Sequence, residues 1–130
     1  MTVYQHSLYN LALEQNQKIL SFRWADDQST LNYEQFQEAC TNYAGYAFEY
    51  ASRYLLIDTH NFTYQLPEEY RTWLEQKHYP RFYKLGVQKI AYLMAEEAMT
   101  YVRNEPAENG KFATHYFTNE KEALEWLSAN

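Results

Sequence analysis

The sequence predicts a single α/β domain, residues 1–130, with a mixed, mostly parallel sheet of four to five strands and helices on its faces. Short apolar segments of strand length alternate with longer segments in which apolar residues recur every three or four positions. Two strand-like segments come first with no helix between them, which predicts an antiparallel hairpin ahead of the parallel strands. The expected order is β-β-α-β-α-β-α-β-α, with no repeat or linker that would divide the core.

The first elements are a hairpin and a long helix. Segments 7–13 and 18–25 are apolar and compatible with β-structure, and the polar residues 14–17 between them suit a hairpin turn. Residues 26–30 form a polar turn that ends in Ser-Thr, which are residue types that cap helices. From residue 31 to about 51 the apolar residues follow helical spacing, which predicts a long amphipathic helix.

A buried strand and an interrupted helix are predicted next. Residues 54–57 are a continuous apolar run, typical of a strand that is covered on both faces. Pro67 suits the first turn of the following helix, and the two glutamates after it suit the positive N-terminal end. Pro80 is expected to break or kink this helix, and a second short segment, 81–85, ends at Gly86.

The last elements are two more strands and a closing helix. Segments 89–94 and 112–117 have the composition of buried strands, and one or two helical turns are expected over 96–102. Asn119 is the predicted cap of the final helix, with Glu122 three residues later to complete a capping box.

The composition is that of a folded, aromatic-rich and acidic protein. It is 46% hydrophobic, 18% aromatic and 22% charged, which excludes an intrinsically disordered chain. The net charge is -6, and the 11 Lys and Arg residues are scattered. Because phosphate-binding surfaces need clustered basic residues, we expect no binding to nucleic acid or to anionic membrane surfaces.

A cytoplasmic protein is expected. Cys40 is the only cysteine and has no partner for an internal disulfide, as is usual in reducing compartments. Its place on the inward stripe of the long helix predicts a buried and inert thiol. No apolar run approaches the roughly 20 residues of a membrane span. The N-terminus MTVYQHSLYN lacks the basic start and the apolar stretch of a signal peptide.

The loop after strand 54–57 contains the most chemically suggestive cluster, Asp58-Thr59-His60. Asp58 and His60 share a side of an extended chain and offer a carboxylate and an imidazole for acid–base chemistry at the carboxyl edge of the sheet. The alternative is that Asp58 and Thr59 bond loop amides while His60 faces water. Because no Ser, Cys or second carboxylate is placed to complete a mechanism, we expect no catalytic residues.

Metal and cofactor sites are not expected either. The histidines show no HxH or HxxxH spacing, and the single cysteine excludes CxxC. The three glycines are isolated, with no GxGxxG or P-loop pattern that would bind a nucleotide.

Aromatic residues concentrate between Phe62 and Tyr83. A helix interrupted at Pro80 cannot bury every ring on one side, and Tyr and Trp are the residues of interface centres. We therefore expect this region to form a surface for a partner or a ligand, the alternative being that the rings belong to the core. The candidate binding residues are Asp58, Thr59, His60, Tyr64, Tyr70, Trp73, Tyr79 and Phe82.

Three stretches resemble the STAS family of SpoIIAA-like, or anti-sigma-factor-antagonist-like, domains, and most closely a bacterial branch of it. They are RYLLIDTHNF with LPEEYRTWL, then GVQKIAYLM, and finally HYFTNEKEALEWL. The resemblance extends over nearly the whole chain as an order of elements, and it implies a STAS-like fold. It also implies a regulatory domain that acts through protein contacts.

In the family, the switch is a phosphorylatable serine at the start of the helix that follows the strand matched here by 54–57. The matching positions fall near Leu66-Pro67-Glu68-Glu69 and contain no hydroxyl. Pro67 cannot be phosphorylated, and the two glutamates place fixed negative charge where a phosphate would lie. We therefore expect the phosphoserine switch to be lost.

Three functions follow, in order of preference. The first is a non-enzymatic regulatory or protein-interaction module that binds an unidentified protein, or a second copy of itself, through residues 59–83. The second is a carrier of a small apolar, lipid-like ligand in a pocket between the 67–85 segment and the sheet, which requires a continuous apolar cavity of at least ~300 Å³ beneath Trp73 and Phe82. The third is an enzyme that uses Asp58 and His60.

Overall fold

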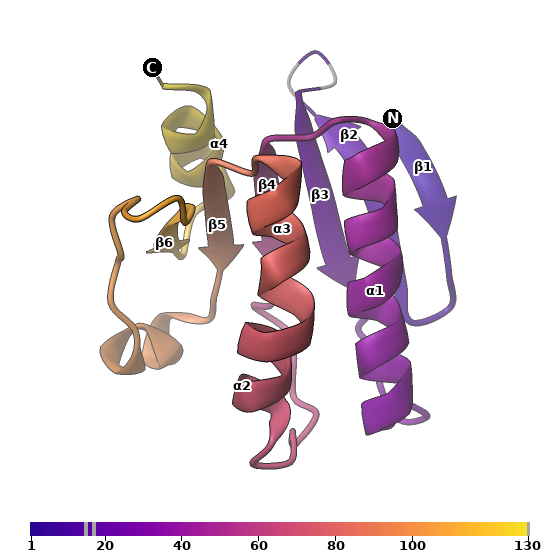
Figure 1. The fold of residues 1–130 in the computed structure, drawn as a ribbon. Helices are drawn as coiled ribbons and strands as arrows, with labels where there is room; N and C mark the ends of the chain where they lie inside the picture. The colour runs from indigo at the N-terminus through magenta and orange to yellow at the C-terminus, as the bar shows by residue number, and fades with distance from the viewer. Residues whose placement is uncertain (15, 17, 130) are drawn as a thin grey trace.

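The computed structural model describes residues 1–14, 16 and 18–129, which form a six-stranded mixed sheet with helices on both faces (Figure 1). The strands lie in the sheet in the order in which they occur along the chain. Neighbours among β1, β2 and β3 are antiparallel, and β3 to β6 run parallel. The strands are β1 (Thr2–Gln5), β2 (Tyr9–Glu14), β3 (Ile19–Trp24), β4 (Tyr54–Asp58), β5 (Lys89–Leu93) and β6 (Ala113–Phe117). The predicted α/β class with a mixed sheet is confirmed.

The predicted count of four to five strands is too low because it leaves out β1. This strand lies at the edge of the sheet, its side chains are exposed or half-buried, and its pairing with β2 shifts register between Thr2 and Tyr4. A short edge strand without a buried apolar face gives no clear alternation in the sequence. The predicted turn at 14–17 includes residues 15 and 17, which lie outside the described residues.

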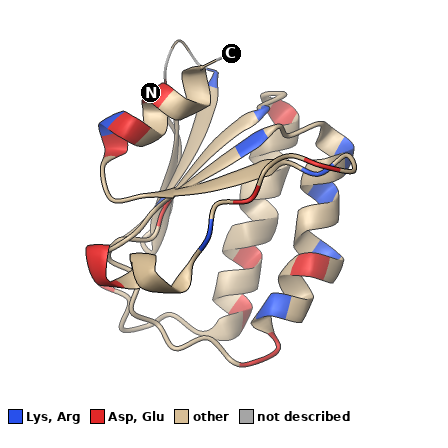
Figure 2. Cartoon of the chain, turned by 90° about the vertical axis from the view of Figure 1, so that its left-hand side faces the viewer, with Lys and Arg blue, Asp and Glu red and all other residues tan. Residues whose placement is uncertain are grey.

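The helices form two layers, one on each face of the sheet. On one face lie α1 (Tyr33–Glu49) and a continuous helical segment made of α2, a π-helix and α3; α4 (Glu120–Ser128) covers the other (Figures 1 and 2). The segment consists of α2 (Tyr70–Trp73), the π-helix η1 (Leu74–His78) and α3 (Tyr79–Leu85). A 3-10 helix, η2 (Glu96–Tyr101), follows β5.

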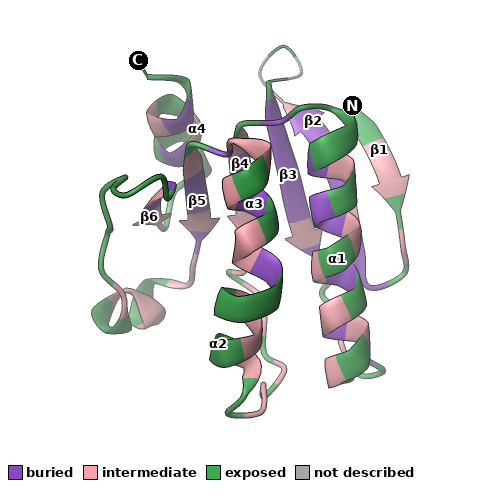
Figure 3. Cartoon of the chain, in the orientation of Figure 1, coloured by how far each residue is buried: buried purple, intermediate pink, exposed green. Residues whose placement is uncertain are grey.

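Alternation along the strands divides the core in two. In β3, Leu20 and Phe22 point toward α1 and α3, whereas Ile19 packs in the smaller cluster beneath α4. The larger cluster includes Phe82, which is fully buried, and the smaller one includes Leu127 of α4. Figure 3 shows buried residues alternating with exposed ones along α1 and α3, as expected for helices that pack one face against a sheet.

The helix boundaries confirm one predicted cap and correct another. The Asn119 side chain accepts a hydrogen bond from the Glu122 backbone N–H, which confirms the predicted cap of α4, but among the described residues the Glu122 side chain does not return the bond that would complete the predicted capping box. The start of α1 is later than the predicted Ser-Thr cap, because Asn32 and Gln35 form a reciprocal capping box there. The Asn32–Gln35 pair satisfies two free backbone N–H groups at the helix start, whereas a capping Ser29 or Thr30 hydroxyl would satisfy one.

The helix after β4 begins at Tyr70, later than the predicted start at Pro67. Pro67 instead lies in the preceding turn, where its carbonyl accepts from the Tyr70 N–H. Consequently the first turn of α2 contains Thr72, whose side chain is exposed. Positions 66–69 have no hydroxyl, but the start of this helix does have one, contrary to the expectation. Pro80 does not end the helix, because η1 widens the winding just before it and Pro80 then occupies the first turn of α3.

Candidate functional site: an aromatic pocket at the carboxyl ends of the parallel strands

A pocket of about 480 Å³ lies between the sheet and the helices α1 and α2–η1–α3. Residues at the carboxyl ends of β3 to β6 form its floor, which is where ligands usually bind in open α/β sheets. The lining residues, in chain order, are Phe22, Trp24, Phe36, Cys40, Tyr43, Ile57, Thr59, Phe62, Leu66, Tyr70, Arg71, Leu74, Glu75, Tyr79, Tyr92, Met94, Tyr101, Val102, Arg103, Glu105 and Tyr116.

The inner end of the pocket is made of buried aromatic rings. Trp24 stacks on Phe36 of α1 with ring centres 5.9 Å apart, and it lies 5.0 Å from the ring of Phe62. Phe22 meets Tyr43 edge to face at 5.4 Å. These residues come together because the even-numbered positions of β3 face α1, whose own apolar stripe faces the sheet. The inner end is therefore an apolar surface of large flat rings.

The π-helix determines which residues of the helical segment face the pocket. The backbone N–H of Tyr79 bonds to the carbonyl of Leu74, five residues earlier. This wide turn places Leu74 and Tyr79 in line, whereas regular α-winding would place His78 below Leu74. Tyr70, Leu74 and Tyr79 therefore line the pocket together. His78 instead packs between Trp73 and Phe82.

Tyrosine hydroxyl groups supply the polar atoms of the wall. The Tyr79 and Tyr92 hydroxyl oxygens lie 3.2 Å apart, and the Tyr92 ring stacks on Tyr116 at 5.4 Å. Burial raises the pKa of Tyr79 to about 12 and raises the pKa values of Tyr92 and Tyr116 as well. All three phenols are therefore protonated at neutral pH. Thr59 also lines the pocket, but its hydroxyl donates to the Leu93 carbonyl at 2.9 Å.

The lining contains the thiol of Cys40. Burial raises its pKa to about 12, so very little thiolate exists at neutral pH. This agrees with the inert thiol expected from the sequence, although the residue is half-buried against the pocket rather than enclosed in the core.

Charged side chains of both signs surround the mouth of the pocket. Arg71 and Glu75 reach it from the helical segment, and Arg103 and Glu105 reach it from the loop after η2. All four are exposed, and Tyr101 beside them is 88% exposed. Two positive and two negative groups leave the mouth without a net charge that would select ions of one sign.

Asp58 and His60 lie outside this pocket. Asp58 is buried on the α4 side of the sheet, where it pairs with Arg23 at 3.0 Å and contacts the His60 Nδ1 atom. Arg23 also pairs with Glu120 at 2.6 Å, so the cluster ties the start of α4 to β3 and β4. His60 is 60% exposed. Strand alternation explains the division, since Thr59 points to the opposite side from both neighbours.

The predicted aromatic candidates have three different environments. Tyr70 and Tyr79 line the pocket. Phe82 is fully buried in the core, and Tyr64 packs half-buried beside the ring of Phe62 at 6.4 Å. Trp73 points toward α1, where it meets Phe36 at 6.4 Å. The cavity thus lies on the Tyr70–Tyr79 side of the helical segment and not beneath Trp73 and Phe82.

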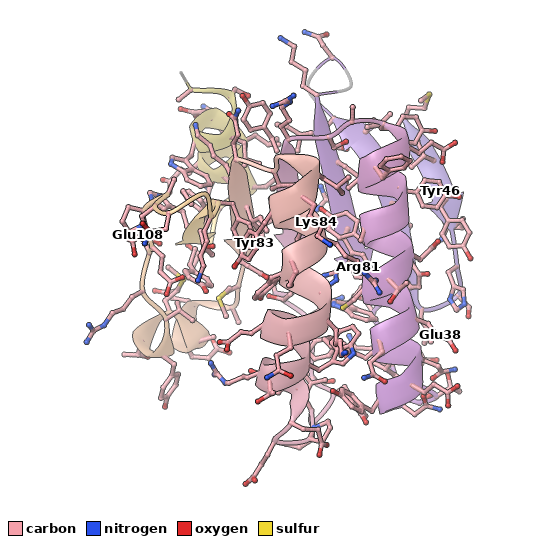
Figure 4. All side chains as sticks on the ribbon, viewed as in Figure 1. Glu38, Tyr46, Arg81, Tyr83, Lys84 and Glu108 are labelled. Atoms are coloured by element: carbon pink, nitrogen blue, oxygen red, sulfur yellow. The ribbon has the colours of Figure 1, made fainter. Side chains whose placement is uncertain are left out.

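Trp73 borders a shallow groove between α1 and the η1–α3 segment. The α1 side carries Glu34 and Glu38, and the other side carries Lys77 and Arg81. Figure 2 shows acidic residues on α1 and mostly basic ones on the helical segment, and Figure 4 shows Arg81 extending toward α1. The groove is a charged surface where two helices meet.

Among the described residues, no group of three or more His, Cys, Asp or Glu side chains is arranged to hold a metal ion. Over the same residues, no helix combines the length and the apolar composition that crossing a bilayer requires. No family model, curated protein or solved structure matches this chain. The function proposed below is therefore inferred from the geometry of the pocket.

Proposed function

We propose that this protein binds a small, largely apolar molecule in the pocket between the sheet and the α2–η1–α3 segment. The observation that carries the proposal is a cavity of about 480 Å³ whose inner end consists of aromatic side chains. Ligand sites typically measure about 300 to 1,000 Å³, with a mainly hydrophobic lining and a few placed polar groups. The volume exceeds the ~300 Å³ that a carrier requires.

The orientation of the aromatic residues supports ligand binding over protein binding in this region. The exposed large hydrophobic side chains among the described residues are Met1, Phe48, Tyr50 and Tyr101. None of them belongs to the 62–83 stretch, whose rings line the pocket or pack against the core, with Trp73 also bordering the groove beside α1. A flat ring surface for a protein partner is therefore not supported there.

The resemblance to STAS domains remains a proposal, supported by the strand–helix succession from β3 to α4. For Asp58 and His60 we propose a structural role and no catalysis, because neither lines the pocket. The Arg23–Asp58 ion pair and the Arg23–Glu120 contact account for the buried carboxylate without a reaction.

A fluorescent probe tests ligand binding directly. N-phenyl-1-naphthylamine is uncharged and becomes strongly fluorescent in apolar surroundings, and it should bind saturably with one site per chain. Leu74→Trp places a larger ring in the pocket and should abolish binding, whereas Gln76→Trp, at an exposed position of the same π-helix, should preserve it. Equal probe binding by the two variants, both with native circular dichroism, would refute the proposal.

A second candidate is self-association or protein binding through the end of α1. Phe48 is 71% exposed and Tyr50 is 39% exposed, and both lie at the C-terminal end of this helix. Apolar rings at such exposure are typical of interfaces. Native mass spectrometry distinguishes the candidates, since a dimer that Phe48→Ser dissociates supports this one and a co-purified small molecule supports the carrier.

A further inference from the structure

Two tyrosines inside the pocket share a single hydrogen bond. Tyr79 is the first residue of α3 and Tyr92 belongs to β5, and their hydroxyl oxygens lie 3.2 Å apart. One hydroxyl donates and the other accepts, so one of the two protons is used and the second remains. No other described residue forms a hydrogen bond with either oxygen. The pair therefore holds one donor that the described part of the chain does not satisfy.

A hydroxyl donor without a partner in an apolar wall is stabilised when a ligand supplies a hydrogen-bond acceptor. An unsatisfied buried donor costs about 1 to 3 kcal/mol, whereas an unused lone pair on the same oxygen costs less. Because burial raises the pKa of Tyr79 to about 12 and also raises the pKa of Tyr92, neither phenol loses its proton near neutral pH. The spare donor is thus a permanent property of the pair.

The surroundings of the pair favour an uncharged acceptor. The groups that act on the pKa of Tyr79 and Tyr92 are other tyrosines and Cys40, with no cationic side chain among them. Arg71 acts on the pKa of Tyr116 instead, and the mouth carries two arginines and two glutamates whose charges offset each other. An anion at the pair would lose its hydration without gaining a counter-charge, and this is costly in an apolar site.

We propose that the Tyr79–Tyr92 pair is a polar subsite that binds a carbonyl oxygen of the ligand, while the aromatic inner end holds its apolar body. The inference rests on the proposed ligand-binding function and narrows the ligand to apolar molecules with a ketone, quinone, ester or amide carbonyl. A flat ring system fits best, because Tyr116 stacks on Tyr92 and the Trp24–Phe36 pair offers further ring faces.

A pair of nearly isosteric probes isolates the carbonyl. 2-Acetylnaphthalene and 2-ethylnaphthalene have the same ring and similar volume, and only the first has an acceptor. Each is titrated against bound N-phenyl-1-naphthylamine, and the ratio of their dissociation constants is compared between variants. The double variant Tyr79→Phe/Tyr92→Phe should shift this ratio against the ketone by about three- to tenfold relative to the unmodified protein, as expected for one neutral hydrogen bond.

Single substitutions give a sharper test of the pair. In Tyr79→Phe the Tyr92 hydroxyl no longer donates to a neighbour and still offers a proton, and the converse holds for Tyr92→Phe. Each single variant should therefore keep a preference for the ketone that only the double variant loses. Tyr116→Phe serves as the matched control within the same cavity and should also keep it.

The outcomes separate this inference from the function on which it depends. If both naphthalenes displace the probe but the double variant leaves the ratio unchanged, the pocket binds ligands and the subsite is refuted. If Tyr116→Phe abolishes the preference for the ketone instead, the ligand carbonyl binds at Tyr116 and the proposal is overturned. Tighter binding of 2-naphthoate than of the ketone, lost in Arg71→Leu, would show an anionic ligand and would also overturn it. If neither naphthalene displaces the probe, the proposed function fails as well.

Discussion

Acidification from pH 7 to pH 4 should destabilise the protein through His78. This residue is 3% exposed, its ring stacks on Trp73 at 5.7 Å and meets Phe82 edge to face at 4.7 Å. Its Nδ1 atom is buried and has no hydrogen-bond partner among the described residues. Burial and the nearby Arg81 guanidinium lower its pKa from 6.5 to about 4.

The direction of the change in unfolding free energy depends on whether the folded or the unfolded chain binds the proton at higher pH. The unfolded chain protonates His78 near pH 6.5, whereas the folded chain does so only near pH 4. The neutral ring therefore stabilises the fold fully above pH 6.5, and this contribution is lost as the pH falls toward 4. At about 1.4 kcal/mol per pH unit between the two values, the loss amounts to about 3 kcal/mol.

Urea unfolding at several pH values between 7 and 4 measures this loss. His78→Phe keeps a ring between Trp73 and Phe82 and should flatten the dependence of the unfolding free energy on pH. Gln76→Phe, at an exposed and non-titratable position of the same helical segment, should leave the dependence as it is. An unchanged slope in His78→Phe, or an NMR titration in which the His78 ring protonates near pH 6.5 in the folded protein, would refute the reasoning.

Three further predictions concern stability and reactivity. Phe82→Ala should lower the unfolding free energy measured in urea by about 3 to 5 kcal/mol, because a fully buried ring leaves a cavity; a loss below 1 kcal/mol would contradict this burial. Asp58→Ala should cost about 2 kcal/mol, since the buried carboxylate accepts a charged hydrogen bond from Arg23, and an unchanged urea midpoint would contradict that bond. Cys40, with a pKa of about 12, should react with a disulfide reagent at pH 8 far more slowly than in the urea-unfolded chain; equal rates would contradict the raised pKa.

The sequence pattern predicts most of the fold because the apolar periods are local. Five strands and the helices between them follow from alternation and helical spacing, and the Asn119 cap follows from its position before an amphipathic segment. The edge strand β1 has no buried face to mark it. The π-turn before Pro80 depends on how the helix packs against α1 and the sheet, and no residue type indicates it.

The sequence predicts only some of the pocket residues, because local apolar patterns do not show which distant segments meet. Tyr70 and Tyr79 stand out because they belong to one aromatic-rich stretch. Tyr92 and Tyr116 lie in segments that the sequence marks only as buried strands, and they reach the pocket because parallel strands end at one edge. Alternation tells which face a side chain occupies, but it does not give the distance between that face and the helix above it. The space between the layers therefore appears only in three dimensions.

The linear order of the strands has a consequence for how the chain folds. Since no strand is inserted between two earlier ones, each new strand joins an edge that already exists, across a connection to its immediate predecessor. During synthesis the N-terminal hairpin can serve as the template to which β4, β5 and β6 are added in turn. The chain is exposed to aggregation at each stage at which β3, β4 or β5 waits for the next strand, because a buried apolar strand then forms an unprotected edge.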